Sequence, residues 1–139
     1  MKQFLLSIFA LTSLTAATQV RSTDPSATSE FRDQAAIGMV ENHPNYLAVH
    51  TKGLVCNSCG IGLRIHIGKL DGVDKSQLTK GVDLDVEKQL VLVAFELDVA
   101  IDVDGVREAI YNAGYDPVHY YLWTGIGGIM QTVYPTSEK

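Results

Sequence analysis

Apolar positions between residues 46 and 122 recur with two periodicities, one typical of strands and one of helices, which alternate along the chain. Period-two alternation marks residues 46–51, 82–86 and 118–122, and this pattern is typical of half-buried β-strands. Residues 90–95 are apolar throughout and rich in β-branched side chains. That run predicts a central strand covered on both faces or nearly so.

Two further segments carry the spacing of an amphipathic helix. Each has apolar residues at helical spacing: Leu63, Ile67 and Leu70 within residues 60–70, and Val106, Ala109, Ile110 and Ala113 in the second segment. Asp102 is placed to cap the second helix and Gly114 to end it in a left-handed conformation. The predicted order is βαββαβ, an α+β ferredoxin-like sandwich in which four antiparallel strands form the sheet and two helices cover one face.

The chain begins with an apolar segment typical of a secretory signal. Lys2 precedes an apolar run over residues 4–14, and small residues follow at positions 15–17. The run is too short to span a bilayer but has the length of a signal-peptide core. We therefore expect a signal peptide over residues 1–17, cleaved after Ala17, and a periplasmic or secreted mature chain; a buried N-terminal strand or helix is the alternative.

Two extensions flank the predicted domain, which covers residues 45–122. Residues 18–44 are predicted to be a linker with one short helix at most, over residues 30–41, with Phe31, Ala35 and Met39 on one face. A solvated arm is the alternative for this helix. The C-terminal tail, residues 123–139, has glycines among apolar residues; it could cover a sheet edge, contact a partner, or pack loosely.

Composition and charge narrow the class of protein. The chain has 139 residues, of which 46% are hydrophobic and 8% aromatic, enough for a single small core. Its 16 acidic residues outnumber 11 basic ones, for a net charge of −5. Nucleic acids and anionic membranes require a basic face, so neither is an expected partner. An acidic surface suits a basic protein partner or none.

The only two cysteines, Cys56 and Cys59, fall between the strand at residues 46–51 and the helix at residues 60–70. A thiol at a helix N-terminus faces unpaired N–H groups and the positive end of the helix dipole, which lower its pKa below the free value of about 8.5. The thiolate form binds metal or attacks a disulfide.

The number of sulfur ligands selects the metal class. Two thiolates without a third cysteine favour a soft ion such as Cu(I) or Hg(II) over Zn(II), which usually takes four ligands. His66 would lie roughly 10 Å along the helix from Cys59, too far to share an ion. His50 and His119 are expected on an exposed face of the sheet, and His43 in a loop, so the histidines are predicted not to be ligands.

Three separated segments, in this order, resemble the heavy-metal-associated domain of copper chaperones, metal-transporting ATPases and the periplasmic mercury-binding protein. They are Gly-Leu-Val-Cys-Asn-Ser-Cys at residues 53–59, the Leu63, Ile67 and Leu70 spacing before Gly72-Val73, and Ala-Ile-Tyr-Asn-Ala-Gly-Tyr at residues 109–115. The family's usual methionine and threonine before the cysteines are replaced by Leu54 and Val55. The resemblance implies that Leu54 packs inward as an apolar anchor.

The same resemblance implies the ligands, the cargo and the partners. Cys56 and Cys59 would bind Cu(I) or Hg(II) as cargo, with no organic cofactor and no enzymatic reaction. The partners would be the metal ion and a metal-transporting membrane protein or another metal donor or acceptor. Tyr115 would lie beside the metal, where its ring could shield the thiolates and its hydroxyl could hydrogen-bond a sulfur; core packing is the alternative role.

The expected function is therefore that of an exported carrier or scavenger of a soft metal ion. A thiol–disulfide oxidoreductase that uses the same pair is the alternative. A thioredoxin-like fold would place a cis-proline loop against the pair, however, and the only later prolines are Pro117 and Pro135. A structural module with a local disulfide is the third possibility.

Overall fold

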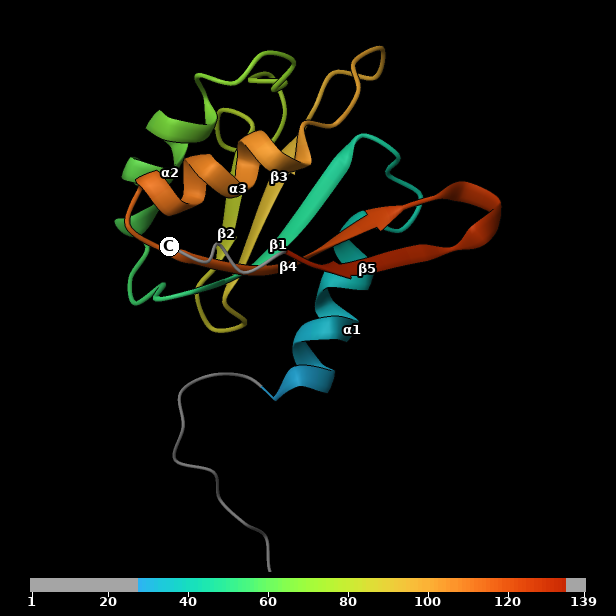
Figure 1. Cartoon of the computed structure of the whole chain (residues 1–139), viewed down its shortest axis with the longest axis horizontal. Helices are drawn as coiled ribbons and strands as arrows, with labels where there is room; N and C mark the ends of the chain where they lie inside the picture. Colours follow the sequence, from blue (N-terminus) through green and yellow to red (C-terminus); the bar gives the residue numbers. More distant parts are fainter. Residues whose placement is uncertain (1–27, 135–139) are drawn as a thin grey trace, which may run out of the picture.

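The computed structural model describes residues 28–134, which form one mixed α/β unit (Figure 1). Its elements follow the order α1 (Ser29–Val40), β1 (Tyr46–Lys52), α2 (Cys59–Ile67), β2 (Val82–Asp85), β3 (Leu90–Ala94), α3 (Val103–Asn112), β4 (Asp116–Trp123), η1 (Gly125–Gly127) and β5 (Ile129–Val133). The predicted signal peptide at residues 1–17 lies outside the described residues. No helix within residues 28–134 is long and apolar enough to cross a membrane.

The sheet has the strand order β2-β3-β1-β4-β5, and all neighbouring strands are antiparallel. From β1 to β4 the chain follows βαββαβ, and α2 and α3 lie together over one face (Figure 1). The predicted ferredoxin-like fold is confirmed. Outside this domain the structure has α1, which corresponds to the short helix considered for residues 30–41, and the additional elements η1 and β5 in the C-terminal tail.

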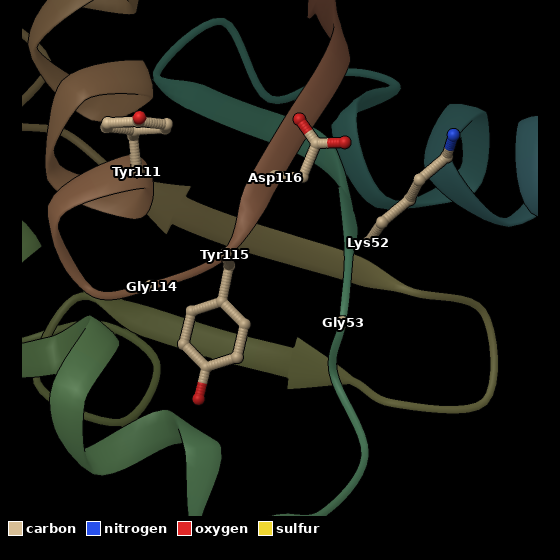
Figure 2. Close-up of a pocket in the computed structure, with 6 residues that line it drawn as sticks. All are labelled: Lys52, Gly53, Tyr111, Gly114, Tyr115 and Asp116. Atoms are coloured by element: carbon tan, nitrogen blue, oxygen red, sulfur yellow. The ribbon is translucent and has the colours of Figure 1, made fainter.

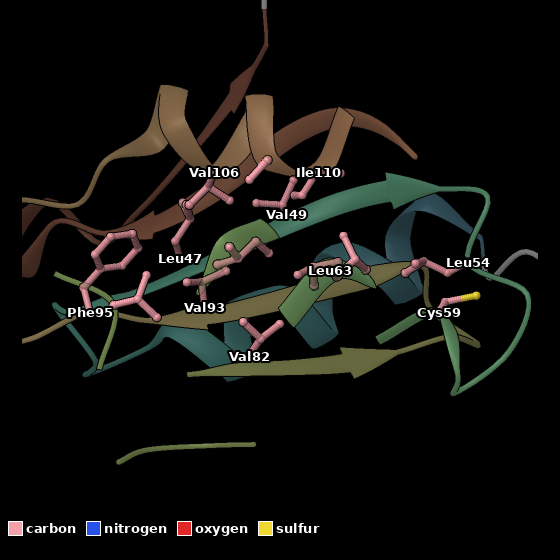
Figure 3. Packing of buried hydrophobic residues seen from close by; sticks show 14 of the residues in the cluster. Leu47, Val49, Leu54, Cys59, Leu63, Val82, Val93, Phe95, Val106 and Ile110 are labelled. Carbon is pink, nitrogen blue, oxygen red and sulfur yellow. The ribbon is translucent and has the colours of Figure 1, made fainter. Parts of the chain in front are cut away.

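The main core lies between the sheet and the helices α2 and α3. Successive side chains of a strand point to opposite faces, so Leu47 and Val49 of β1 point into this core whereas Ala48 points away from it. Fully buried partners come from both layers: Leu63, Ile67, Val82, Val91, Val93, Phe95, Val106 and Ile110 (Figure 3). Burial of each such side chain contributes about 1.5–3 kcal/mol of hydrophobic stabilisation before entropy is counted. This layer fixes α2, and with it the cysteine loop.

Helix α1 covers the second face of the sheet. Ala36 and Val40 are fully buried there against residues of three strands: Ala48, Leu90, Leu92 and Tyr121. The predicted apolar face was partly right: Ala35 and Met39 are partly buried against this cluster. Phe31, however, is 52% exposed, and the fully buried stripe runs one position later, through Arg32. Because Arg32 is polar, the apolar pattern of the sequence did not indicate this buried stripe. Arg32 is accommodated because its Nε donates a hydrogen bond to the Lys88 carbonyl at 3.0 Å.

Strand β3 is buried along its whole length, as its uniformly apolar sequence predicted. The reason is that helices lie on both sides of it: α2 and α3 cover the face carrying Val91 and Val93, and α1 covers the face carrying Leu90 and Leu92. This second layer distinguishes the chain from the predicted two-layer sandwich.

The ends of α3 follow the predicted capping. The Asp102 carboxylate accepts a hydrogen bond from the Gly105 N–H at 2.9 Å, and Gly114 adopts the left-handed region with φ of 96° after the helix. A glycine takes this conformation without the strain that a Cβ would bring. The chain then turns directly into Tyr115 and β4, which brings Tyr115 toward the cysteine loop.

The tail after β4 forms an edge strand. Thr124 closes the turn, since its N–H donates to the Gly128 carbonyl at 2.8 Å, and β5 then pairs with β4 in register from Trp123–Ile129 to His119–Val133. Tyr134 returns to the main core, where its hydroxyl donates to the Val103 carbonyl at 3.1 Å. Of the alternatives for this tail, residues 129–134 follow the one in which it covers a sheet edge.

Candidate metal centre

The two cysteines meet at the start of α2. Cys59 is the first residue of the helix, and Cys56 lies in the preceding loop. Their sulfur atoms are 3.3 Å apart and form no disulfide. The Cys56 side chain is exposed and its sulfur is 2.8 Å from the Ser58 hydroxyl, whereas Cys59 is largely buried at the end of the main core (Figure 3). The pair therefore combines one accessible thiol with one fixed thiol.

The Cys59 thiol ionises more readily than a free cysteine. Its pKa is lowered to about 7, first by a hydrogen bond with the Tyr115 side chain, then by the Val55 backbone N–H. Burial opposes this shift, and the neighbouring Cys56 contributes a smaller lowering. A hydrogen bond to a charged form favours that form, so the thiolate of Cys59 is more populated near neutral pH than that of a free cysteine.

Tyr115 is held beside the pair by the chain reversal after α3. Its own pKa is raised, chiefly by the hydrogen bond with Cys59, so the hydroxyl stays protonated and donates to the sulfur. Figure 2 shows the hydroxyl directed toward α2, while the ring borders an open pocket of about 630 Å³. This pocket is lined by Lys52, Gly53, Tyr111, Gly114, Tyr115 and Asp116. This placement supports the hydrogen-bonding role considered for Tyr115 from the sequence, and the ring also packs against the main core, as the alternative role required.

In the loop before the cysteines, one side chain is buried in the core and the next is exposed to solvent. The Leu54 side chain is only 2% exposed, which confirms its expected role as an apolar anchor. The Val55 side chain is 81% exposed. The loop therefore leaves the core between Leu54 and Val55, immediately before Cys56.

The placement predicted for two histidines was wrong. His50 is only 5% exposed, and His119 lies opposite it on β4 with the rings 4.9 Å apart. Their strand face is the one that α1 covers, which sequence alternation alone could not reveal. His43 stacks on Tyr46 in the loop after α1, with ring centroids 4.5 Å apart.

Within residues 28–134, no group of three or more histidine, cysteine, aspartate or glutamate side chains is arranged to hold a metal ion. Cys56 and Cys59 thus form a two-sulfur site as far as the described chain is concerned. Two sulfur ligands suit soft ions better than Zn(II).

The sequence analysis did not identify Gln89, which is the last residue of the turn between β2 and β3 and contacts the cysteine loop. Its side-chain oxygen accepts hydrogen bonds from the N–H groups of Gly53 at 3.0 Å and Leu54 at 3.1 Å. No sequence pattern marks this role, because a glutamine near a hairpin turn is ordinary and its partners lie about 35 positions earlier.

No family model matches the chain, and no curated protein matches it. Solved structures do match. The CopZ metallochaperone shares 26% identity over 52% of this chain and 98% of its own, with a TM-score of 0.43. CopP from Helicobacter pylori shares 26% over 52% and 98%, with a TM-score of 0.41. The yeast copper transporter domain CCC2A shares 20% over 52% and 90%, also with a TM-score of 0.41.

Proposed function

We propose that this chain binds one soft metal ion, Cu(I) or Hg(II), between Cys56 and Cys59 and passes it on by thiolate exchange. It acts as a carrier or scavenger, and no covalent chemistry is performed on the ion. The observation that carries this proposal is the pair of free sulfur atoms 3.3 Å apart, of which one is exposed and the other has a pKa of about 7.

The geometry of the pair suits a two-coordinate ion after a small movement. At metal–sulfur distances of roughly 2.3 Å, two sulfurs on opposite sides of an ion lie about 4.6 Å apart. The present separation is 3.3 Å, so the sulfurs must move apart by about 1.3 Å. Cys56 can supply this movement because it lies in an exposed loop, whereas Cys59 is fixed by α2.

The same asymmetry supports transfer. An incoming thiolate from a partner can reach the ion on the exposed Cys56 side and replace the Cys56 sulfur while Cys59 still holds the ion. Cys59 is largely buried at the first position of α2, so it is the sulfur that we expect to leave last. The partner is then a metal-transporting membrane protein or another metal donor or acceptor with thiolates of its own.

We further propose that the mature chain works in the periplasm or outside the cell, on the basis of the signal-like residues 1–17. An exposed pair of thiols in an oxidising compartment tends to form a disulfide, which does not bind metal. Early loading with the ion or a reducing partner would keep the thiols available.

The test is an anaerobic titration of the reduced protein with Cu(I) against a competing chromophoric chelator. We expect one tightly bound ion per chain, and loss of tight binding in both Cys56→Ser and Cys59→Ser. Met130→Leu serves as the control, because it removes an exposed sulfur far from the pair on β5. Stoichiometric binding by a double serine variant would refute the proposal.

A thiol–disulfide oxidoreductase is the second candidate, because a thiol with a pKa of about 7 next to another thiol resembles a redox pair. The arrangement of the two thiols weighs against it. The sulfur with the lowered pKa belongs to Cys59, which is largely buried and therefore less accessible to a disulfide substrate. Disulfide reduction at a rate comparable to thioredoxin, lost in Cys56→Ser, would favour this alternative.

A further inference from the structure

The side chain of Gln89 spans the gap between the β2–β3 turn and the base of the cysteine loop. In addition to accepting from Gly53 and Leu54, its Nε2 donates to the Leu54 carbonyl at 2.5 Å and to the Val86 carbonyl at 2.6 Å. A primary amide has two donor hydrogens and one acceptor oxygen with two lone pairs, so this side chain is fully used. Three of its four bonds go to the loop.

The backbone of Gln89 reinforces this contact. Its carbonyl accepts a hydrogen bond from the Thr51 N–H at 2.8 Å, at the end of β1. Its φ of 55° lies in the left-handed region, which costs free energy for a residue that is not glycine. The fold therefore keeps a strained backbone at the position from which the side chain reaches the loop.

The contact fixes the loop at one defined point. Leu54 is held twice, by burial of its side chain and by the Gln89 amide on its N–H and carbonyl groups. After Leu54 the Val55 side chain is 81% exposed, and the bonds that follow lie within the loop and the start of α2: the Val55 N–H contacts the Cys59 thiol, and the Cys59 N–H donates to the Cys56 carbonyl at 3.1 Å. Movement that separates the two sulfurs must therefore take place after Leu54, and it displaces Cys56 while Cys59 stays on α2.

We propose that Gln89 is a positioning residue for the metal-binding loop: through Gly53 and Leu54 it holds the loop so that Cys56 remains within reach of an ion bound to Cys59. This inference rests on the metal-binding function proposed above. Without Gln89, the exposed Gly53 N–H and the part-buried Leu54 N–H lose their acceptor, and the loop gains conformations that must be given up when the ion binds. The ion would then bind more weakly and leave faster.

Gln89→Gly is the most informative variant, because it removes the side chain and also relieves the strain of the left-handed backbone. Lys80→Gly is the matched control: Lys80 is exposed, lies in a different loop and has the same φ of 55°. Gln89→Glu is the second variant. It keeps an acceptor for Gly53 and Leu54 but loses the donor to the Leu54 carbonyl, and it provides the test if the glycine variant fails to fold.

The experiment combines Cu(I) competition titrations with amide hydrogen exchange, at a temperature where circular dichroism shows each variant folded. We expect about tenfold weaker Cu(I) binding in Gln89→Gly, a smaller loss in Gln89→Glu, and none in Lys80→Gly. The Gly53 and Leu54 amides should exchange at least tenfold faster in Gln89→Gly, while core amides of β3 stay unchanged. A general loss of stability would instead speed exchange throughout.

Binding that is unchanged within threefold in both Gln89 variants would overturn the positioning role. Weaker binding without faster exchange at Gly53 and Leu54 would also overturn it, because the effect would not then pass through the base of the loop. Absence of both Cu(I) and Hg(II) binding in the unmodified protein would refute the proposed function itself. The two failures are therefore distinguishable.

Discussion

The hydroxyl group of Tyr115 donates a hydrogen bond to the sulfur of Cys59, and this contact is the largest cause of the lowered pKa of that thiol. The two residues lie far apart in the sequence: Cys59 begins α2, and Tyr115 follows α3. The packing of α2 beside α3 on the sheet brings them together. The reactivity of the cysteine pair thus depends on the ferredoxin-like arrangement as a whole.

Removal of this hydroxyl should make Cys59 a weaker acid. In Tyr115→Phe the pKa of the Cys59 thiol should rise from about 7 toward the ordinary cysteine value, because the thiolate loses its main hydrogen-bond donor. The thiolate fraction at pH 7 should fall several-fold. The measurement is the rate of alkylation of Cys59 against pH in a Cys56→Ser background.

Tyr111→Phe is the matched control for this experiment, since Tyr111 lines the same open pocket but is largely exposed. Its alkylation profile should match that of the parent. An unchanged Cys59 profile in Tyr115→Phe would show that the helix N-terminus, and not the tyrosine, activates the thiol.

Acid should destabilise the face of the sheet that α1 covers. The pKa of His50 is lowered from 6.5 to about 4, first by burial and then by the nearby Arg32, with His119 and Lys52 adding to the effect and Asp33 opposing it. The His119 pKa is lowered as well, again chiefly by burial. The folded state therefore favours neutral imidazoles, and its stability is fully present above pH 6.5.

Stability should then fall as the pH drops from about 6.5 toward 4, because the unfolded chain takes up protons that the folded chain resists. We expect His50 to contribute a loss of roughly 2 kcal/mol over this range, a figure reduced from the full shift for partial solvent screening. Urea unfolding at pH 7.5 and pH 4.5 measures it. His50→Gln should flatten the dependence, and an equally steep dependence in that variant would contradict this account.

The docking of α1 should be separable from metal binding. Ala36→Glu places a charge on the fully buried side of α1 against β1, β3 and β4, and we expect it to release the helix at a cost of several kcal/mol. Amide exchange within α1 should accelerate. Cu(I) affinity should stay within threefold of the parent, because the cysteine pair lies at the end of the other core.

Gln34→Glu provides the control for this variant, since it makes a similar change on the exposed side of the same helix. It should leave α1 docked. A loss of Cu(I) affinity in Ala36→Glu comparable to that in a cysteine variant would show that the two faces of the sheet are coupled.

Short-range patterns were sufficient to predict the βαββαβ core because each of its elements carries its own periodicity. The caps of α3 at Asp102 and Gly114 are local features of the same kind. The uniformly apolar sequence of β3 also predicted a central strand covered on both faces or nearly so. The element that covers the second face was not evident, because Arg32 interrupts the apolar stripe of α1 and its hydrogen bond to Lys88 is formed only in the folded chain.

The site was predictable to a similar degree. The spacing of Cys56 and Cys59, their loop and the burial of Leu54 could be expected from the sequence and its resemblance. The hydrogen bonds of Gln89 to the loop and the burial of His50 could not, because each depends on contacts between segments that only the complete sheet brings together. Polar contacts of this kind leave no periodic pattern.

The histidines should not take part in metal binding. His66→Ala and His43→Ala should change Cu(I) affinity by less than about threefold, or roughly 0.7 kcal/mol. His66 lies about two helical turns beyond Cys59 on α2, and His43 stacks on Tyr46 before β1. His119→Ala should alter stability instead, since its Nε2 is 2.6 Å from the Tyr121 hydroxyl beneath α1. Competition titration and urea unfolding of the same variants separate the two effects.

The most direct measurement is X-ray absorption at the copper edge of the anaerobically loaded protein, with one Cu(I) per chain. The account predicts two sulfur neighbours at a single distance and no nitrogen neighbours, together with complete loss of this signal in Cys56→Ser/Cys59→Ser. A coordination shell that contains imidazole nitrogen in the monomer, or a copper-loaded double serine variant, would contradict the claim that Cys56 and Cys59 alone hold the ion.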